Sequence, residues 1–290
     1  MIWLIAVGVL VTLTILVLTF TLVQALRLIH PPLRPFSTHP REYDVAHEEV
    51  FFLGPAGKLG AWYLPGTNGR TLIGLHGITD NRQQWLAPAV DLQRRGYTVL
   101  MMDFRRHGQS EGRYTSYGDL ETGDIAAALD YLQTRGDIDM ERVGLMGLSL
   151  GAIAALIAAA RLPQVGAVMA EAAFGDLQKD LSIAFSRYTG APAFPLANLV
   201  IWWGQRLSGA QLSNIRPVEV IGQIAPRPVF IIGEMQDTLV DEPRTSDELF
   251  ARAGEPKELW QIPDAGHVQA YTVHPAEYID RLDAFFQKSL

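Results

Sequence analysis

One serine in this sequence lies in a pattern that suits a nucleophile. Residues 147–151 read G-L-S-L-G, with Ser149 at the centre. The apolar run 142–146 precedes this motif, and residues 152–160, which are all alanine, leucine or isoleucine, follow it. These patterns predict a strand, a sharp turn and a buried helix, which together expose a serine hydroxyl at a helix N-terminus. The alternative is an ordinary strand-to-helix turn whose serine has no catalytic role.

A serine hydroxyl is a weak nucleophile, so it needs a base, and the base needs an orienting carboxylate. In a doubly wound sheet, reactive groups gather beyond the carboxyl ends of the strands. Asp237 follows the apolar run 228–232, and His267 follows the run 258–262. The chain order Ser149, Asp237, His267 therefore predicts a nucleophile, an acid and a base.

Other residues compete for two of these roles. Asp241 and Glu171 stay open as alternatives for the acid, because Asp241 lies shortly after Asp237 and Glu171 follows the strand after the serine turn. Three further histidines are expected to be structural or to lie on the surface, and these are His76, His107 and His274. For Asp103, which also follows a strand, we expect a local role in capping the loop 105–108.

The patterns around these residues alternate between strand and helix. Strands are expected at 71–75, 97–102, 143–146, 165–170, 228–232 and 258–262, and helices at 83–95, 120–134, 150–161, 243–253 and 275–287. Such alternation predicts right-handed crossovers and a doubly wound, mainly parallel α/β sheet. Two paired strands at 50–53 and 60–64 come first. The alternation lapses over 174–226, which predicts a mainly helical cap inserted between two strands.

The N-terminus is the main change in composition. Residues 1–26 contain no charged side chain, and at about 1.5 Å per residue such a helix spans the ~30 Å hydrocarbon core of a bilayer. A cleaved signal peptide is the rival interpretation, but it would have a basic start and a shorter apolar run. We therefore expect a transmembrane anchor at 1–28, a proline-rich linker at 29–42 and a soluble domain at 43–290.

Basic residues suggest an orientation for this single-pass helix. Arg27, Arg34 and Arg41 all follow the span, and no basic side chain precedes it. Because cytoplasmic flanks carry an excess of lysine and arginine, the soluble domain is expected in the cytoplasm.

Composition also excludes some classes of ligand. The net charge is −7, which gives a nucleic-acid partner no electrostatic support. The sequence contains no cysteine, which rules out a thiolate nucleophile and cysteine-ligated metals. It also lacks an H-E-x-x-H metal motif, a P-loop and a dinucleotide-binding fingerprint. We therefore expect neither a metal nor another cofactor.

From about residue 50 to its end, the chain resembles the α/β-hydrolase superfamily, and in particular the membrane-anchored serine hydrolases of the BEM46-like group. The matching segments are L-H-G at 75–77, D-F-R-R-H-G-Q-S at 103–110, the motif around Ser149, D-T-L-V at 237–240 and A-G-H at 265–267. The resemblance implies the α/β-hydrolase fold and an oxyanion hole built from the backbone N–H groups of Ile78 and Leu150. Arg106 departs from the family pattern, because relatives usually have glycine there.

These observations predict a membrane-anchored serine hydrolase that cleaves carboxylic esters or thioesters of a small-molecule or lipid acyl substrate. An apolar cap tethered beside a bilayer favours a lipophilic acyl group. Two alternatives remain, namely a peptidase or amidase of the same fold, and a catalytically silent binding protein.

Overall fold

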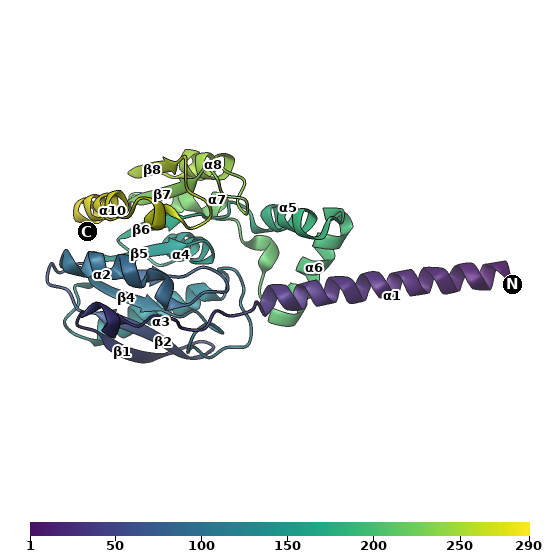
Figure 1. Ribbon diagram of the computed structural model, residues 1–290, viewed down its shortest axis with the longest axis horizontal. Coiled ribbons are helices and arrows are strands. Elements are labelled where there is room, and N and C mark those ends of the chain that lie inside the picture. Colours follow the sequence, from purple (N-terminus) through teal and green to yellow (C-terminus); the bar gives the residue numbers. More distant parts are fainter.

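The computed structural model describes the backbone of residues 1–290 and every side chain except that of Tyr188. Eight strands form one sheet in the order β1-β2-β4-β3-β5-β6-β7-β8 (Figure 1). The first two strands form an antiparallel hairpin, β2 runs antiparallel to β4, and all later neighbours are parallel. This sheet confirms the predicted fold class. The strands are β1 (Glu48–Gly54), β2 (Gly57–Leu64), β3 (Thr71–Leu75), β4 (Thr98–Met102), β5 (Val143–Leu148), β6 (Ala167–Glu171), β7 (Val229–Glu234) and β8 (Lys257–Ile262).

Helices cover both faces of the sheet, and each face has its own apolar core. Side chains of α2 (Leu86–Arg94) and α10 (Pro275–Ser289) fill one core, which includes Trp85 and Phe285. The other core is filled from α3 (Glu121–Thr134), α4 (Leu150–Arg161) and α8 (Arg244–Arg252). The inner strands are therefore buried on both faces, which explains why they read as continuous apolar runs rather than as alternating ones.

Some element boundaries differ from those expected. The helix predicted at 83–95 is divided into a 3₁₀ turn, η2 (Arg82–Trp85), and α2. The proline at 88 lies in the first turn of α2, where its missing N–H costs no intrahelical hydrogen bond. The strand expected at 228–232 continues to Glu234, so β7 carries a buried carboxyl at its end.

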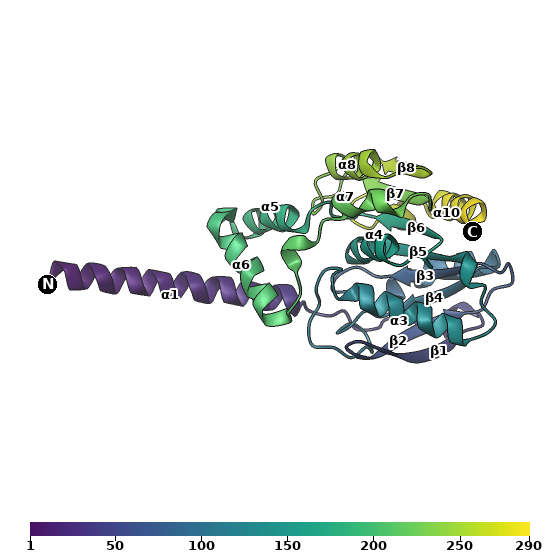
Figure 2. The same cartoon turned by 180° about the vertical axis from the view of Figure 1, so that it is seen from behind.

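Between β6 and β7 the chain forms helices, which we call the cap (residues 174–226). These helices are α5 (Leu177–Thr189), α6 (Ala193–Ser208) and α7 (Pro217–Val220), with the 3₁₀ turns η4 (Leu212–Asn214) and η5 (Ile221–Ile224). Because the cap follows β6 and precedes β7, it stands at the carboxyl-terminal edge of the parallel strands. In Figures 1 and 2 the helices α5 and α6 lie beside the N-terminal helix.

That N-terminal helix, α1 (Ile2–Ile29), is one long rod that projects away from the sheet (Figures 1 and 2). Its length, and a mean hydropathy of 2.7, are sufficient for it to cross a membrane. Residues 1–20 are all exposed, whereas Thr21, Ala25 and Ile29 are buried. These three residues recur every fourth position, so they form one stripe on the helix. The last turns of α1 therefore pack against the rest of the protein.

The segment after α1 is extended but is not a free linker. The backbone N–H of Arg34 donates to the carbonyl of Thr79 at 2.8 Å, and its guanidinium pairs with Asp80 at 2.7 Å. Ser37 donates its N–H to the side chain of Gln83 at 2.7 Å. The segment therefore lies against the loop that follows β3, and it ends in a 3₁₀ turn at Pro40–Tyr43.

Candidate active site

Ser149 occupies a strained turn between β5 and α4. Its φ is +52°, a value that residues other than glycine rarely adopt. The flanking glycines are required by space, because a Cβ on Gly147 would lie 2.3 Å from the carbonyl oxygen of Gly151. Conversely, a Cβ on Gly151 would lie 2.1 Å from the carbonyl oxygen of Leu75. The backbone N–H of Ser149 donates to the carbonyl of Glu171 at 2.9 Å, which holds the turn against β6.

The structure brings the predicted nucleophile, base and acid together in one hydrogen-bonded row. His267 Nε2 lies 2.9 Å from the Oγ of Ser149, and His267 Nδ1 lies 2.6 Å from Asp237 Oδ2. The Asp237 side chain is fully buried, while 19% of the His267 side chain is exposed. A carboxylate on Nδ1 keeps the proton on that nitrogen, so Nε2 is free to accept the serine proton.

Among the three carboxylates that the sequence leaves open, Asp237 is the one that contacts His267. Its second oxygen, Oδ1, accepts the backbone N–H groups of Leu239 and Val240 at 2.6 and 3.0 Å. Asp241 instead forms an exposed ion pair with Arg244. The Asp237 carboxylate is therefore oriented by its own loop before it meets the imidazole.

The two backbone N–H groups expected to bind an oxyanion belong to segments that flank Ser149. Leu150 is the first residue of α4, where N–H groups have no partner inside the helix. Ile78 follows Gly77, and Gly77 lies so near the nucleophile that an added Cβ would be 3.5 Å from the Cβ of Ser149. The side chain of Gln84 accepts the Gly77 N–H at 2.7 Å and so holds this loop in place.

A pair of buried carboxyl groups lies behind the histidine, and the sequence patterns did not identify it as a unit. Glu234 accepts the backbone N–H groups of residues 268–270, at distances from 2.7 to 3.0 Å, directly after His267. Glu171 lies beside Glu234 and accepts the Tyr278 hydroxyl at 2.7 Å. Burial raises the pKa of both groups, that of Glu234 to about 9, so the pair retains a proton at neutral pH.

The sequence offers one indication of this carboxyl pair, namely that each glutamate ends a buried strand. Glu171 ends β6 and Glu234 ends β7, and these two strands are neighbours in the sheet. A charged residue at the end of an apolar run indicates either a solvent-facing edge or a buried partner. Which of the two applies depends on the strand order, and that order is a property of the folded sheet.

Comparison with known proteins identifies a family for this chain. Residues 75–267, which run from the end of β3 to the histidine, match the sequence profile of the X-Pro dipeptidyl-peptidase (S15) family. The chain belongs to this S15 family. An uncharacterized protein of Salmonella typhi, YfhR, is 30% identical over 251 residues, which cover 84% of this chain and 82% of YfhR.

This S15-family chain is also similar to proteins whose names state a reaction. A Pyrococcus furiosus esterase, PF2001, has a solved structure that matches with a TM-score of 0.76 at 27% identity, covering 90% of this chain and 98% of the esterase. The polyketide transferase ATR5 of Stachybotrys chlorohalonatus is 29% identical, over 85% of this chain and 96% of ATR5. These names differ in reaction, and the structural neighbour favours an esterase-type hydrolase of α/β fold within the S15 family.

The remaining predicted side chains of this S15-family protein have structural partners. His76 is fully buried, its Nδ1 lies 2.7 Å from the Gly77 carbonyl, and its Nε2 accepts the Phe104 N–H at 3.1 Å. Burial lowers the pKa of His76 well below its usual value, so the ring is neutral. His107 bonds to the Arg105 carbonyl at 2.9 Å, and His274 pairs with Asp264 on the surface.

The sequence predicts that Asp103 caps only the loop 105–108, but its side chain accepts hydrogen bonds from two separate segments. One oxygen accepts the Arg82 N–H at 2.7 Å and the other accepts the Gln109 N–H at 2.9 Å. Burial raises the pKa of Asp103 to about 6, although the nearby Arg82 guanidinium opposes that rise. Arg106, the departure from the family pattern, has φ of +66° and thus adopts a conformation that glycine favours.

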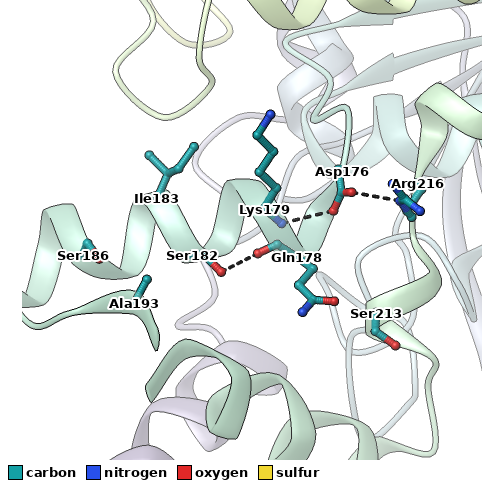
Figure 3. Close-up of a pocket in the computed structure, with 9 residues that line it drawn as sticks. All are labelled: Asp176, Gln178, Lys179, Ser182, Ile183, Ser186, Ala193, Ser213 and Arg216. Carbon is teal, nitrogen blue, oxygen red and sulfur yellow. Dashed lines mark hydrogen bonds and ion pairs between the residues drawn. The ribbon is translucent and has the colours of Figure 1, made fainter. Parts of the chain in front are cut away.

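Three cavities of the S15-family fold differ in chemistry. One cavity, of about 830 Å³, is lined mainly by polar residue types and lies on one face of α5 (Figure 3). A second polar cavity, of about 340 Å³, includes Glu171 and Tyr278 in its wall. The third, about 670 Å³, is mainly apolar and lies between α1 and the cap. The residues that line the cavity of about 830 Å³ are Asp176, Gln178, Lys179, Ser182, Ile183, Ser186, Ala193, Ser213 and Arg216.

Within the described part of the chain, no group of three histidine, aspartate or glutamate side chains could hold a metal ion.

Proposed function

We propose that this protein is a membrane-anchored serine hydrolase that cleaves carboxylic esters or thioesters through an acyl-enzyme on Ser149. The observation that carries the proposal is the continuous row from Ser149 Oγ through His267 to Asp237. Nucleophilic acyl transfer needs a buried carboxylate, an imidazole in a defined tautomer and a serine on a strained strand-to-helix turn. Within the S15 family, the BEM46-like group fits a chain that begins with a long apolar helix.

The reaction follows from the geometry. His267 Nε2 takes the proton of Ser149 Oγ as this oxygen bonds to the acyl carbon, and the carbonyl oxygen becomes an oxyanion. The N–H groups of Ile78 and Leu150 stabilise that oxyanion, and each such donor contributes on the order of 10²–10³ in rate. The intermediate then collapses, the alcohol or thiol leaves with the proton from His267, and the acyl group stays on Ser149. Water, activated by His267, releases the acid by the same steps in reversed roles.

The packing of α1 supports a retained anchor rather than a cleaved signal peptide. Residues 23–25 read V-Q-A, which resembles a weak signal-peptidase site, and cleavage after Ala25 would remove the buried Thr21 and Ala25 from the fold. We assign the anchor to 1–28, the connecting segment to 29–42 and the hydrolase domain to 43–290. The arginines that follow the span favour a cytoplasmic domain.

A peptidase is the second candidate, because the S15 family carries that description. Both reactions use the same nucleophile, so they differ in the leaving group that the site accepts. Comparing the turnover of nitrophenyl acyl esters with that of peptide nitroanilides separates them. Preferential turnover of the anilides would replace the esterase assignment with a peptidase one.

The nucleophile itself is tested with a fluorophosphonate probe on the full-length protein. Wild type is expected to be labelled, and Ser149→Ala is expected to remain unlabelled and to lose ester turnover by about 10⁶. Circular dichroism of both proteins verifies folding. If folded wild type is not labelled, the protein is a binding protein with a hydrolase fold rather than an enzyme of this class.

A further inference from the structure

The apolar cavity between the N-terminal helix and the cap has the dimensions of a ligand site. Its volume of about 670 Å³ falls within the range of about 300–1,000 Å³ typical of small-molecule pockets. Three helices supply its apolar wall, namely α1, α5 and α6. The main apolar residues are Leu28, Leu181, Phe185, Ala197, Val200 and Ile201.

The last turns of α1 form one side of this cavity. Gln24, Arg27 and Leu28 line it directly. One turn earlier, the ring of Phe20 meets that of Phe185 edge-on, with centroids 6.2 Å apart. Residues 1–20 of the same helix are exposed and uncharged, so the cavity begins where the fully exposed part of α1 ends.

The chemistry of the cavity suits an alkyl chain. Few of its lining residues carry a polar group, and a chain of methylene groups needs no hydrogen-bond partner. The lining residues with polar groups are Gln24, Arg27, Tyr117 and Thr189. The opposite face of α5 provides a contrast, because Lys179, Asp176 and Arg216 line the polar cavity there (Figure 3). The helix therefore separates an apolar compartment that faces α1 from a polar one that faces away from it.

One residue that lines the apolar cavity precedes a glycine that packs on α4, the helix that follows Ser149. Tyr117 lines it, and the next residue, Gly118, packs so closely on α4 that an added Cβ would lie 2.9 Å from the Cγ2 of Ile153. Ile153 lies one turn beyond Ser149, and its N–H bonds to the Ser149 carbonyl at 3.1 Å. The wall of the cavity is therefore linked, through Tyr117 and Gly118, to the first turn of α4.

We propose that this cavity binds the acyl chain of a membrane lipid and that α1, beyond anchoring the protein, forms the wall along which the chain enters from the bilayer. The inference rests on the proposed function, because the bound chain is the acyl part of the ester that Ser149 attacks. The substrate is then a lipid ester taken from the membrane rather than a short soluble ester.

A matched pair of substitutions on α5 tests the cavity through kinetics. Ala184 faces the apolar cavity and Ser186 faces the polar one. With full-length protein in vesicles, wild type should favour nitrophenyl dodecanoate over nitrophenyl acetate in kcat/KM. Ala184→Trp fills the cavity and should lower that ratio by about tenfold or more, since several methylene groups lose their burial. Ser186→Trp should leave it unchanged. An equal ratio in all three proteins, or an equal drop in both variants, overturns the inference.

A second measurement does not depend on catalysis. Full-length Ser149→Ala protein is placed in phosphatidylcholine vesicles whose acyl chains carry a diazirine, and the photoadducts are mapped by mass spectrometry. Adducts are expected on 181–201 as well as on the exposed part of α1, and Ala184→Trp should reduce only those on the cap. Adducts on 2–20 alone overturn the inference. Cap adducts on Ser149→Ala, combined with a wild type that hydrolyses neither ester, would uphold the lipid site and overturn the proposed function instead.

Discussion

At the scale of single residues, the contact between His267 and Asp237 is the centre of the candidate site. The imidazole receives the serine hydroxyl at one nitrogen and a buried carboxylate at the other. The carboxylate is held by the two N–H groups of its own loop, so it can orient the ring without losing its own position. This arrangement makes the tautomer of His267 depend on one side chain.

Replacing Asp237 by asparagine should therefore disable the base while preserving the shape of the site. An amide that turns its NH₂ toward Nδ1 stabilises the wrong tautomer, and the loss in kcat is expected to be on the order of 10⁴. The measurement is ester turnover of Asp237→Asn at pH 7 beside its thermal unfolding. Asp241→Asn, which removes only an exposed ion pair with Arg244, is the control and should retain activity. Equal losses in the two variants would contradict the assignment.

At the scale of elements, the Glu171–Glu234 pair connects three parts of the protein. Glu171 ends β6 and its carbonyl holds the serine turn, while Glu234 ends β7 and holds the residues after His267. One shared proton therefore lies between the segment of the nucleophile and the segment of the base. Burial and the neighbouring Glu171 carboxylate raise the pKa of Glu234, which places the proton on Glu234.

This pair should make stability fall as pH rises. The folded pKa of Glu234 is about 9 against a usual value of 4.5, so the folded state holds a proton that the unfolded state has released. The contribution is fully present below about pH 4.5 and is lost as pH approaches 9. Urea unfolding at pH 6, 7.5 and 9 measures it. In Glu171→Gln the amide can still donate to Glu234 and accept from Tyr278, so this variant should show a weaker decline. An identical decline in both proteins would assign it to other groups.

At the scale of the whole molecule, the N-terminal helix has an exposed part and a part that packs against the protein. Residues 1–20 are exposed, and Thr21, Ala25 and Ile29 pack against the cap. The Cβ of a residue at Gly204 in α6 would lie 3.7 Å from both Leu28 and Ile29. The N-terminal helix and the rest of the protein therefore share an interface in addition to their covalent connection.

Two truncations separate these two parts. Removing residues 1–19 deletes exposed residues only, so a folded domain should remain that labels with fluorophosphonate. Removing residues 1–28 also deletes the buried Thr21 and Ala25 and uncovers the apolar face of α6, which should cost about 2 kcal/mol or more. Urea unfolding of the two proteins in the same buffer measures the difference. Equal stability would mean that the last turns of α1 contribute nothing to the fold.

The sequence alone determined the fold class and the identity of most candidate site residues. The G-x-S-x-G turn, the apolar runs and the helix patterns are local signals, because each depends on contiguous residues and on the periods of strand and helix. The order of Ser149, Asp237 and His267 along the chain then sufficed to predict an α/β-hydrolase site. The apolar composition of residues 1–26 likewise predicted one long helix.

Only the tertiary structure distinguished Asp237 from Asp241 and Glu171, since all three follow strands in the sequence. It also revealed the carboxyl pair, because Glu171 and Glu234 meet only when β6 and β7 are neighbours. The packing of α1 on the cap has the same origin, as it depends on which faces of distant helices come together. These features arise from contacts between segments far apart in the chain, and no local pattern encodes such contacts.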